Sequence, residues 1–282
     1  MQTKRSILLG IAACCLIATT FSACKKDSKE NSDSDTTAAQ DNSLAEGQYN
    51  DVNTMVDASV NITGFTFRLE TGARVEDALG GCTKVTLDTL NTACTLTIDF
   101  GTTNCEGPDG RKRRGKILAT WNGKYRDKNT VVNITFDNYF VNNNQIKGSH
   151  KTTNLGYNTA QHLVYKIEVD GSIVKADNGG TIYWKSTRER EWVAGSTTPA
   201  NITDDTYSIT GSASGTTAEG VAYTINITAP LVRKMNCYWF ESGKLDVTPA
   251  GRLTRTLDYG STGCDNKGTV TIGNATFNVT LP

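Results

Sequence analysis

The sequence lacks an excess of either charge and contains very few histidines. Its 282 residues include 29 basic and 29 acidic side chains, whereas nucleic-acid-binding domains normally carry a marked basic excess. The two histidines, His150 and His162, lie in no metal-binding or nucleophile motif. The composition therefore argues against a nucleic-acid partner, and the sequence predicts no metal site, no cofactor and no catalytic residues.

The N-terminal residues have the form of a secretory signal. Lys4 and Arg5 precede an apolar run from Ser6 to Ala23, which is the order of charged and apolar regions in such signals. The run ends in Phe-Ser-Ala-Cys at residues 21–24 and resembles the lipobox of bacterial lipoproteins, although Phe21 stands where Leu is usual. The resemblance implies a signal peptide over 1–23 and a lipidated Cys24 that attaches the protein to a membrane. The alternative is an uncleaved transmembrane anchor.

The stretch that follows, residues 24–48, is rich in Lys, Asp, Ser, Asn and Thr. It has too few apolar side chains to form a core, so we expect a flexible tether. Its charged start, residues 24–30, resembles that of many Bacteroidota lipoproteins, in which such a patch directs export to the outer face of the outer membrane. A simple soluble spacer is the alternative for this stretch.

The remainder, residues 49–282, predicts an all-β domain. Proline is scarce, with 5 residues, and apolar and polar side chains alternate as in half-buried strands over residues 95–100, 132–136, 163–170, 221–228 and 277–281. Pairs rich in Gly, Asn and Asp mark turns at residues 122–123, 170–171, 178–180, 219–220 and 273–274. We expect an antiparallel meander that forms a sandwich or a strongly curved open sheet. Apolar spacing also predicts a short N-terminal helix over Gln48 to Val60.

Five cysteines remain beyond the signal and the lipidation site, and in an oxidising compartment they would form disulfides: Cys82, Cys94, Cys105, Cys237 and Cys264. In a hairpin the residue numbers of paired positions add up to a constant, so the midpoint of any pair falls at the turn. The midpoint of Cys237 and Cys264 falls at residues 250–251, where the sequence has a turn signal. Cys82 and Cys105 centre on residues 93–94, where the turn signal is weaker. We therefore predict bridges Cys82–Cys105 and Cys237–Cys264, with Cys94 as a buried free thiol. A Cys82–Cys94 bridge is the alternative.

A motif of the form apolar-Asp-aromatic-Gly-[Thr/Ser]-Thr-x-Cys occurs twice, at residues 98–105 and 257–264. We call it the twin motif. Its Asp99 and Asp258 resemble the pair of pepsin-like aspartic proteases, in which two carboxylates share a proton and activate water. The aromatic residue after each Asp departs from that pattern. We expect instead that each Asp closes its own tight turn and points away from the core, and an aspartic-type hydrolase is the alternative.

A basic run at residues 110–116 predicts a loop between two strands. Arg111, Lys112, Arg113 and Arg114 in this run are candidate ligand-binding residues for an anionic lipopolysaccharide or acidic glycan. The alternative for the run is a solvated turn. The sequence Arg-Glu-Arg-Glu at residues 188–191 alternates in sign and predicts a solvent-facing strand or turn.

Two tryptophans are candidates for an aromatic platform that would bind sugars. Trp184 and Trp192 lie in a stretch with other aromatic residues, and core packing is the alternative for their rings. Tyr183 and Trp184 are adjacent and fall on opposite faces of a strand, so we expect at least one of them to be exposed.

Three segments, at residues 98–111, 134–141 and 257–266, resemble uncharacterised Bacteroidota outer-membrane lipoproteins. The resemblance covers most of residues 80–282 and implies no activity. We therefore expect a lipid-anchored cell-envelope protein, placed in the outer membrane, with a non-catalytic binding or structural role and a glycan or another envelope component as its partner. A carbohydrate-binding surface module and the hydrolase are the alternative functions.

Overall fold

One antiparallel sheet and one long helix make up the described structure. The computed structural model describes residues 33–62, 79–90, 93–198, 201–261 and 263–282. In this part of the chain the helices are α1 (Thr37–Ile62) and the short 3-10 helix η1 (Ile202–Asp204). The strands are β1 (Lys84–Asp88), β2 (Ala93–Asp99), β3 (Cys105–Glu106), β4 (Lys112–Asn122), β5 (Val131–Val141), β6 (Asn144–Tyr157), β7 (Leu163–Val174), β8 (Thr181–Ala194), β9 (Thr206–Thr216), β10 (Ala222–Lys234), β11 (Ser242–Pro249), β12 (Arg255–Asp258), β13 (Lys267–Ile272) and β14 (Ala275–Thr280).

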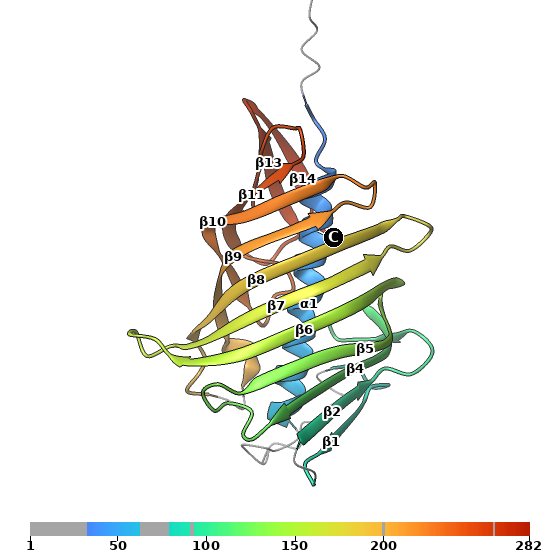
Figure 1. Cartoon of the computed structure of the whole chain (residues 1–282), viewed down its shortest axis with the longest axis vertical. Helices are drawn as coiled ribbons and strands as arrows, with labels where there is room; N and C mark the ends of the chain where they lie inside the picture. The colour runs from blue at the N-terminus through green and yellow to red at the C-terminus, as the bar shows by residue number, and fades with distance from the viewer. Residues whose placement is uncertain (1–32, 63–78, 91–92, 199–200, 262) are drawn as a thin grey trace, which may run out of the picture. The chain divides into compact units, whose positions relative to one another are not determined.

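The strands follow one another through the sheet in chain order. Each pairs antiparallel with the next from β1 to β14, except that the short β3 pairs only with β4 and lets β2 and β4 meet directly. The sheet is open, with β1 at one edge and β14 at the other. The predicted all-β meander is confirmed, and the structure is a strongly curved open sheet rather than a sandwich (Figure 1).

Helix α1 lies along the inner face of the curved sheet (Figure 1). Most of its described residues are buried. The ring of Tyr49 stacks on Trp184 of β8 with 5.5 Å between ring centroids. The Tyr49 hydroxyl donates to the carbonyl of Lys147 on β6 at 2.8 Å. A helix enclosed on so many sides needs polar partners as well as an apolar stripe.

The helix is much longer than the predicted Gln48–Val60 segment, and the predicted tether is wrong over residues 37–48. The polar side chains of Asp41, Asn42 and Glu46 in this segment are buried because the sheet supplies partners for them. The Asp41 carboxylate accepts from Lys175 Nζ at 3.0 Å and from the backbone N–H of Ala218 at 2.8 Å. Asp35 accepts from the N–H of Thr37 at 2.9 Å and closes the first turn. The predicted signal peptide, Cys24 and the rest of the predicted tether up to residue 32 lie outside the described residues.

The predicted alternation of buried and exposed side chains is confirmed in the strands. In β2, Leu96 and Ile98 are fully buried on the inner face, and the corresponding positions of β5 and β10 hold Ile134 and Ile225. The intervening residues face outward. The core therefore lies between the inner face of the sheet and α1.

One predicted turn is wrong. The pair Asp170-Gly171 lies within β7, where Gly171 pairs with Gly148 on one side and Trp184 on the other. A Cβ at position 171 would collide with the Tyr49 hydroxyl and with the carbonyl of Lys147. This glycine therefore allows α1 to approach the sheet closely.

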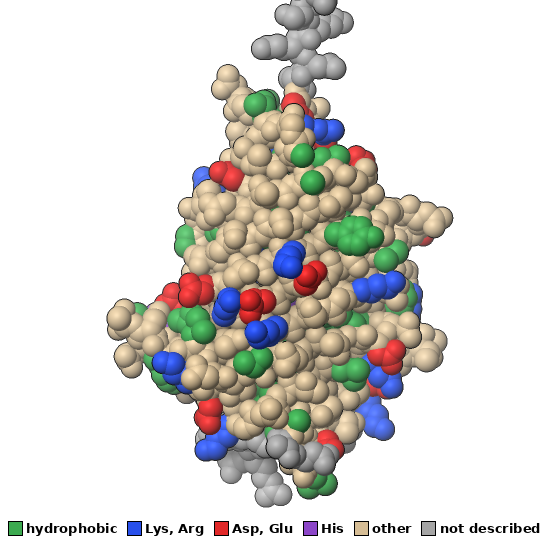
Figure 2. All heavy atoms as spheres, viewed as in Figure 1, with side chains coloured by type: hydrophobic (Ala, Val, Ile, Leu, Met, Phe, Trp, Pro, Cys, Tyr) green, Lys and Arg blue, Asp and Glu red, His purple; other side chains and the backbone are tan. Residues whose placement is uncertain are grey.

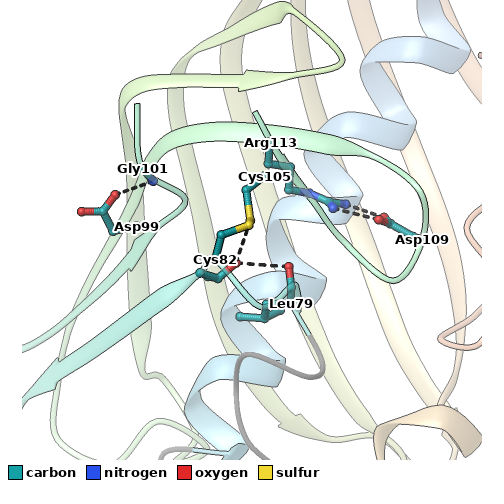
Figure 3. The surroundings of a disulfide bond; sticks show 8 residues. Leu79, Cys82, Asp99, Gly101, Cys105, Asp109 and Arg113 are labelled. Atoms are coloured by element: carbon teal, nitrogen blue, oxygen red, sulfur yellow. Dashed lines mark hydrogen bonds and ion pairs between the residues drawn. A yellow bond between two sulfur atoms is a disulfide. The ribbon is translucent and has the colours of Figure 1, made fainter. Parts of the chain in front are cut away.

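Both predicted disulfides are confirmed, Cys82–Cys105 and Cys237–Cys264, with Cys94 free and buried. The second bridge flanks the β11–β12 hairpin, close to the predicted centre. The midpoint argument is less accurate for the first bridge. Strand β1 pairs with β2 so that Lys84 faces Asp99, and Cys105 belongs to β3 beyond the loop (Figure 3). The bridge therefore ties the start of β1 to β3 rather than closing the open end of one ladder.

Candidate functional site

Arginines on the inner face of the sheet pair with carboxylates of α1. Arg188 of β8 donates to Glu46 through Nε at 3.0 Å and Nη2 at 2.6 Å, and both side chains are buried. Two residues along the same strand, Arg190 donates to Asp57 at 3.1 Å. The prediction that residues 188–191 face solvent is therefore wrong for the two arginines, because inward-facing arginines are buried when a fixed carboxylate neutralises them.

The basic run is divided between the two faces of the sheet. Arg111 and Arg113 are buried and form ion pairs with Asp51 of α1, with N–O distances of 3.3 and 2.9 Å. Arg113 also donates to Asp109 at 2.5 Å (Figure 3). Strand β4 begins at Lys112, so the predicted loop is wrong from this residue onward.

The other two candidate residues of the run, Lys112 and Arg114, face outward. Lys112 is exposed, and the Arg114 guanidinium lies 3.8 Å from the centre of the Phe140 ring and donates to Asn104 and Asn143. The four predicted ligand-binding residues of the run thus do not converge on one site.

Arg233 of β10 differs from the other buried arginines. Within the described residues, five of the six buried arginines have a carboxylate within 4 Å, and these five are Arg111, Arg113, Arg188, Arg190 and Arg255. Arg233 is 4 % exposed and has no such carboxylate there, and its Nε and Nη1 atoms are buried without an acceptor. Burial lowers the pKa of Arg233 to about 9. Its guanidinium lies 5.2 Å from the centre of the Tyr238 ring.

A cavity of about 410 Å³ opens in front of Arg233, and we call it the Arg233 cavity. Its described lining consists of Asp51, Thr54, Met55, Ala58, Leu79, Pro108, Asp109, Arg113, Thr203, Arg233, Met235, Asn236, Cys237 and Tyr238. The floor residues Asp51, Arg113 and Arg233 are buried, whereas Pro108 and Asn236 are exposed at the mouth. The cavity therefore runs from solvent to the charged groups between α1, β4 and β10.

The predicted aromatic platform is not formed by the two tryptophans. Trp184 is 3 % exposed and Trp192 is 2 % exposed. Their indole N–H groups donate to Asn42 and Asp205, at 3.0 and 3.1 Å respectively. Tyr183 is 58 % exposed, which confirms that one of the adjacent pair faces outward.

The outer face of the sheet carries charges of both signs side by side. Figure 2 shows basic and acidic side chains in alternation across its middle. Glu168 pairs with Lys166 and Lys151, at 2.8 and 3.3 Å, and Asp170 pairs with Lys185 at 3.0 Å. These pairs are on the surface and form no field of a single sign.

The twin motif forms two separate turns. Asp99 accepts from the N–H of Gly101 at 2.8 Å, and Asp258 accepts from the N–H of Gly260 at 2.9 Å. Lys116 lies 3.3 Å from Asp99 and Lys244 lies 2.8 Å from Asp258, on the neighbouring strand in each case. Figure 3 shows the first of these turns. The turn prediction matches this geometry.

The two carboxylates have no arrangement of a proton-sharing pair in the described structure. No hydrogen bond joins them there, and each is engaged by its own turn and its own lysine. The hydrogen bond from Gly101 lowers the pKa of Asp99. Burial alone would raise the pKa of Asp258, but Lys244 and Gly260 lower it. A shared-proton pair would instead raise one of the two values.

The histidines lie apart from the Arg233 cavity lining. His162 Nδ1 lies 2.7 Å from a Glu191 oxygen near the surface. His150 is buried on β6, with Nε2 3.4 Å from the Thr152 hydroxyl. Across the described ranges, no group of three or more His, Cys, Asp or Glu side chains could hold a metal ion. No helix in these ranges has the length and apolar character needed to cross a membrane.

Comparison with known proteins gives no relative: no family model, no curated protein and no solved structure matches the chain.

Proposed function

We propose that this chain is a lipid-anchored protein of the cell envelope that binds a ligand in the Arg233 cavity without transforming it. The observation that supports the proposal is the position of Arg233, a buried cation without a described carboxylate at the floor of a cavity that reaches solvent. A buried charge without a partner costs stability, and such a group is common where function requires it.

The chemistry of the cavity lining favours binding over catalysis. Arginine keeps its proton near neutral pH and serves as a fixed cation rather than as a general base. Burial alone would raise the pKa of Asp109, but hydrogen bonds from Arg113 hold it below its ordinary value. The one cysteine in the described lining, Cys237, is in a disulfide. These groups supply charge and hydrogen bonds, not a nucleophile and its base.

The envelope location is supported by the two disulfides, because such bonds persist in oxidising compartments. It also depends on the lipobox-like end of the apolar run at Cys24. We expect the Cys24→Ala protein to take up no labelled palmitate and to lose its attachment to membranes. Palmitate labelling of the variant at the wild-type level would contradict the anchor.

Binding is tested on the full-length protein purified from its own envelope in mild detergent. Native mass spectrometry should show an additional non-protein mass in a 1:1 ratio, unchanged after prolonged incubation. Ala58→Phe places a ring in the cavity from α1 and should remove this mass, whereas Ala194→Phe at an exposed position should keep it. If both variants keep the additional mass, the ligand lies outside the Arg233 cavity. A change in the mass of the ligand during incubation would contradict a non-catalytic role.

A further inference from the structure

The charges around the Arg233 cavity do not balance among the described residues. Arg111, Arg113 and Arg233 carry three positive charges, and the carboxylates within reach are those of Asp51 and Asp109. Arg111 stacks on one side of the Tyr238 ring, and Arg233 lies 5.2 Å from the centre of the same ring. The group therefore has one positive charge in excess, in surroundings where charge is poorly screened.

The hydrogen bonds show the same imbalance. Each of these three arginines has buried nitrogens without a hydrogen-bond acceptor: Nη2 of Arg111, Nε of Arg113, and Nε and Nη1 of Arg233, while Nη1 of Arg111 has only its ion pair with Asp51 at 3.3 Å. Each such donor costs free energy when it is buried and unpaired. A group with several acceptor oxygens and a negative charge would satisfy both deficits at once. The planar guanidinium is well matched to phosphate and carboxylate oxygens.

One part of the cavity wall is apolar, beside the polar side chains of Thr54, Thr203 and Asn236. Met55 and Ala58 of α1, Leu79, and Met235 line the same space as Arg233. Methionine side chains adapt to ligands of varied shape. The volume of about 410 Å³ lies within the range of small-molecule sites. A ligand that fills this space would place an apolar portion against these side chains and its charged end at the arginines.

We infer that the Arg233 cavity binds an oxyanion, a phosphate ester or a carboxylate with an adjoining apolar portion, and that Arg233 holds its charged end. This inference rests on the proposed function and names the ligand class of the same site. The same chemistry is present in a free phosphate and in the head group of an acidic phospholipid, so the experiment has an arm for each.

The test uses the full-length protein in a neutral detergent and a buffer free of phosphate and sulfate. Inorganic phosphate is titrated in one arm and monomeric dihexanoyl phosphatidic acid in the other, with binding followed by calorimetry. Both should bind. An affinity for the lipid more than about tenfold above that for phosphate would assign the apolar wall to an acyl chain, and similar affinities would assign the site to a free oxyanion. Failure of both anions to bind would overturn the inference.

Arg233→Met removes the proposed anchor and should weaken binding of either anion by about tenfold to a hundredfold, as expected for a lost charge-assisted hydrogen bond. The matched control is Lys234→Gln, because Lys234 is the next residue of β10, faces outward and pairs with Glu241 at 2.7 Å. Its affinity should stay within about twofold of the wild-type value. Equal affinities in wild type and Arg233→Met would overturn the inference.

A second measurement separates a ligand-binding arginine from a structural one. In the absence of anion, Arg233→Met should unfold at a higher temperature than wild type, because the substitution removes an unpaired buried charge. A lower unfolding temperature together with unchanged anion affinity would make Arg233 structural and overturn the inference. A neutral ligand found by native mass spectrometry would also overturn it, while leaving the proposed binding function intact.

Discussion

Glu46→Leu should lower the free energy of unfolding by about 3 to 5 kcal/mol, the usual cost of removing one partner of a buried ion pair. The substitution keeps most of the side-chain volume but leaves Arg188 charged and buried on β8 without its two acceptor oxygens. The lost stability comes from the unpaired, desolvated guanidinium of Arg188, and not from the net contribution of the ion pair to stability. Urea unfolding at pH 7, followed by circular dichroism, measures the difference.

The double variant Glu46→Leu with Arg188→Met distinguishes these two contributions. Because both charges are then absent, most of the lost stability should return. The surface pair Lys185–Asp170 is the control, with side chains 72 % and 67 % exposed. Asp170→Asn should cost at most about 1 kcal/mol. A double variant as unstable as Glu46→Leu would contradict the desolvation argument.

Such pairs also explain how α1 is placed. The helix carries carboxylates at Asp41, Glu46, Asp51 and Asp57, and each meets a different cation of the sheet or its turns. A shift of α1 by one turn would leave several buried charges without partners at once. We therefore expect these pairs to fix the position of the helix along the sheet, a role for which buried polar groups are best known.

The strands were predictable because their signal is local. Side-chain alternation in β2, β5 and β7 depends only on neighbouring residues, and it gave the inner and outer faces correctly. The disulfides were predictable for a similar reason, since the twin motif and its turn signals place the cysteines near each other. The full length of α1 was not predictable from local sequence. Residues 37–48 have no clear apolar periodicity, and their charged side chains are buried through partners far along the chain, such as Lys175 and Arg188.

The candidate site was only partly predictable. Arg111 and Arg113 were predicted to bind a ligand; Arg113 lines the Arg233 cavity and Arg111 does not, and both pair with Asp51 of α1. Arg233 was missed. A shift in the pairing of β9 with β10 occurs between Asn226 and Leu231. The burial of alternate residues nevertheless continues along β10 from Ile225 to Leu231 and Arg233, so alternation extended beyond the predicted strand, which ended at residue 228, places Arg233 on the inner face. What the sequence does not indicate is that no described carboxylate lies beside Arg233, because that depends on where α1 and β4 place their charged side chains.

The second large predicted effect is a loss of folding stability at acid pH that is caused by His150. His150 is buried on the inner face of β6, where burial and the nearby Arg190 lower its pKa to about 3. In the unfolded chain the pKa returns to about 6.5. Between these values the unfolded state binds a proton that the folded state does not, so stability falls as the pH falls from 6.5 towards 3. Between pH 7 and pH 4, His150 should therefore account for about 3 kcal/mol of lost stability.

Comparison of wild type with His150→Gln isolates this contribution, because any cost in packing is the same at both pH values. Asp205 has the opposite effect. Its pKa is raised to about 6, chiefly by burial, so the folded state binds its proton first and stability rises as the pH falls. Asp205 is present in both proteins and cancels in the difference. Urea unfolding at pH 7 and pH 4 should show that wild type loses about 3 kcal/mol more than the variant. Equal losses in the two proteins, or an imidazole signal that titrates near pH 6 in folded wild type and is absent from His150→Gln, would show that His150 takes up its proton without unfolding.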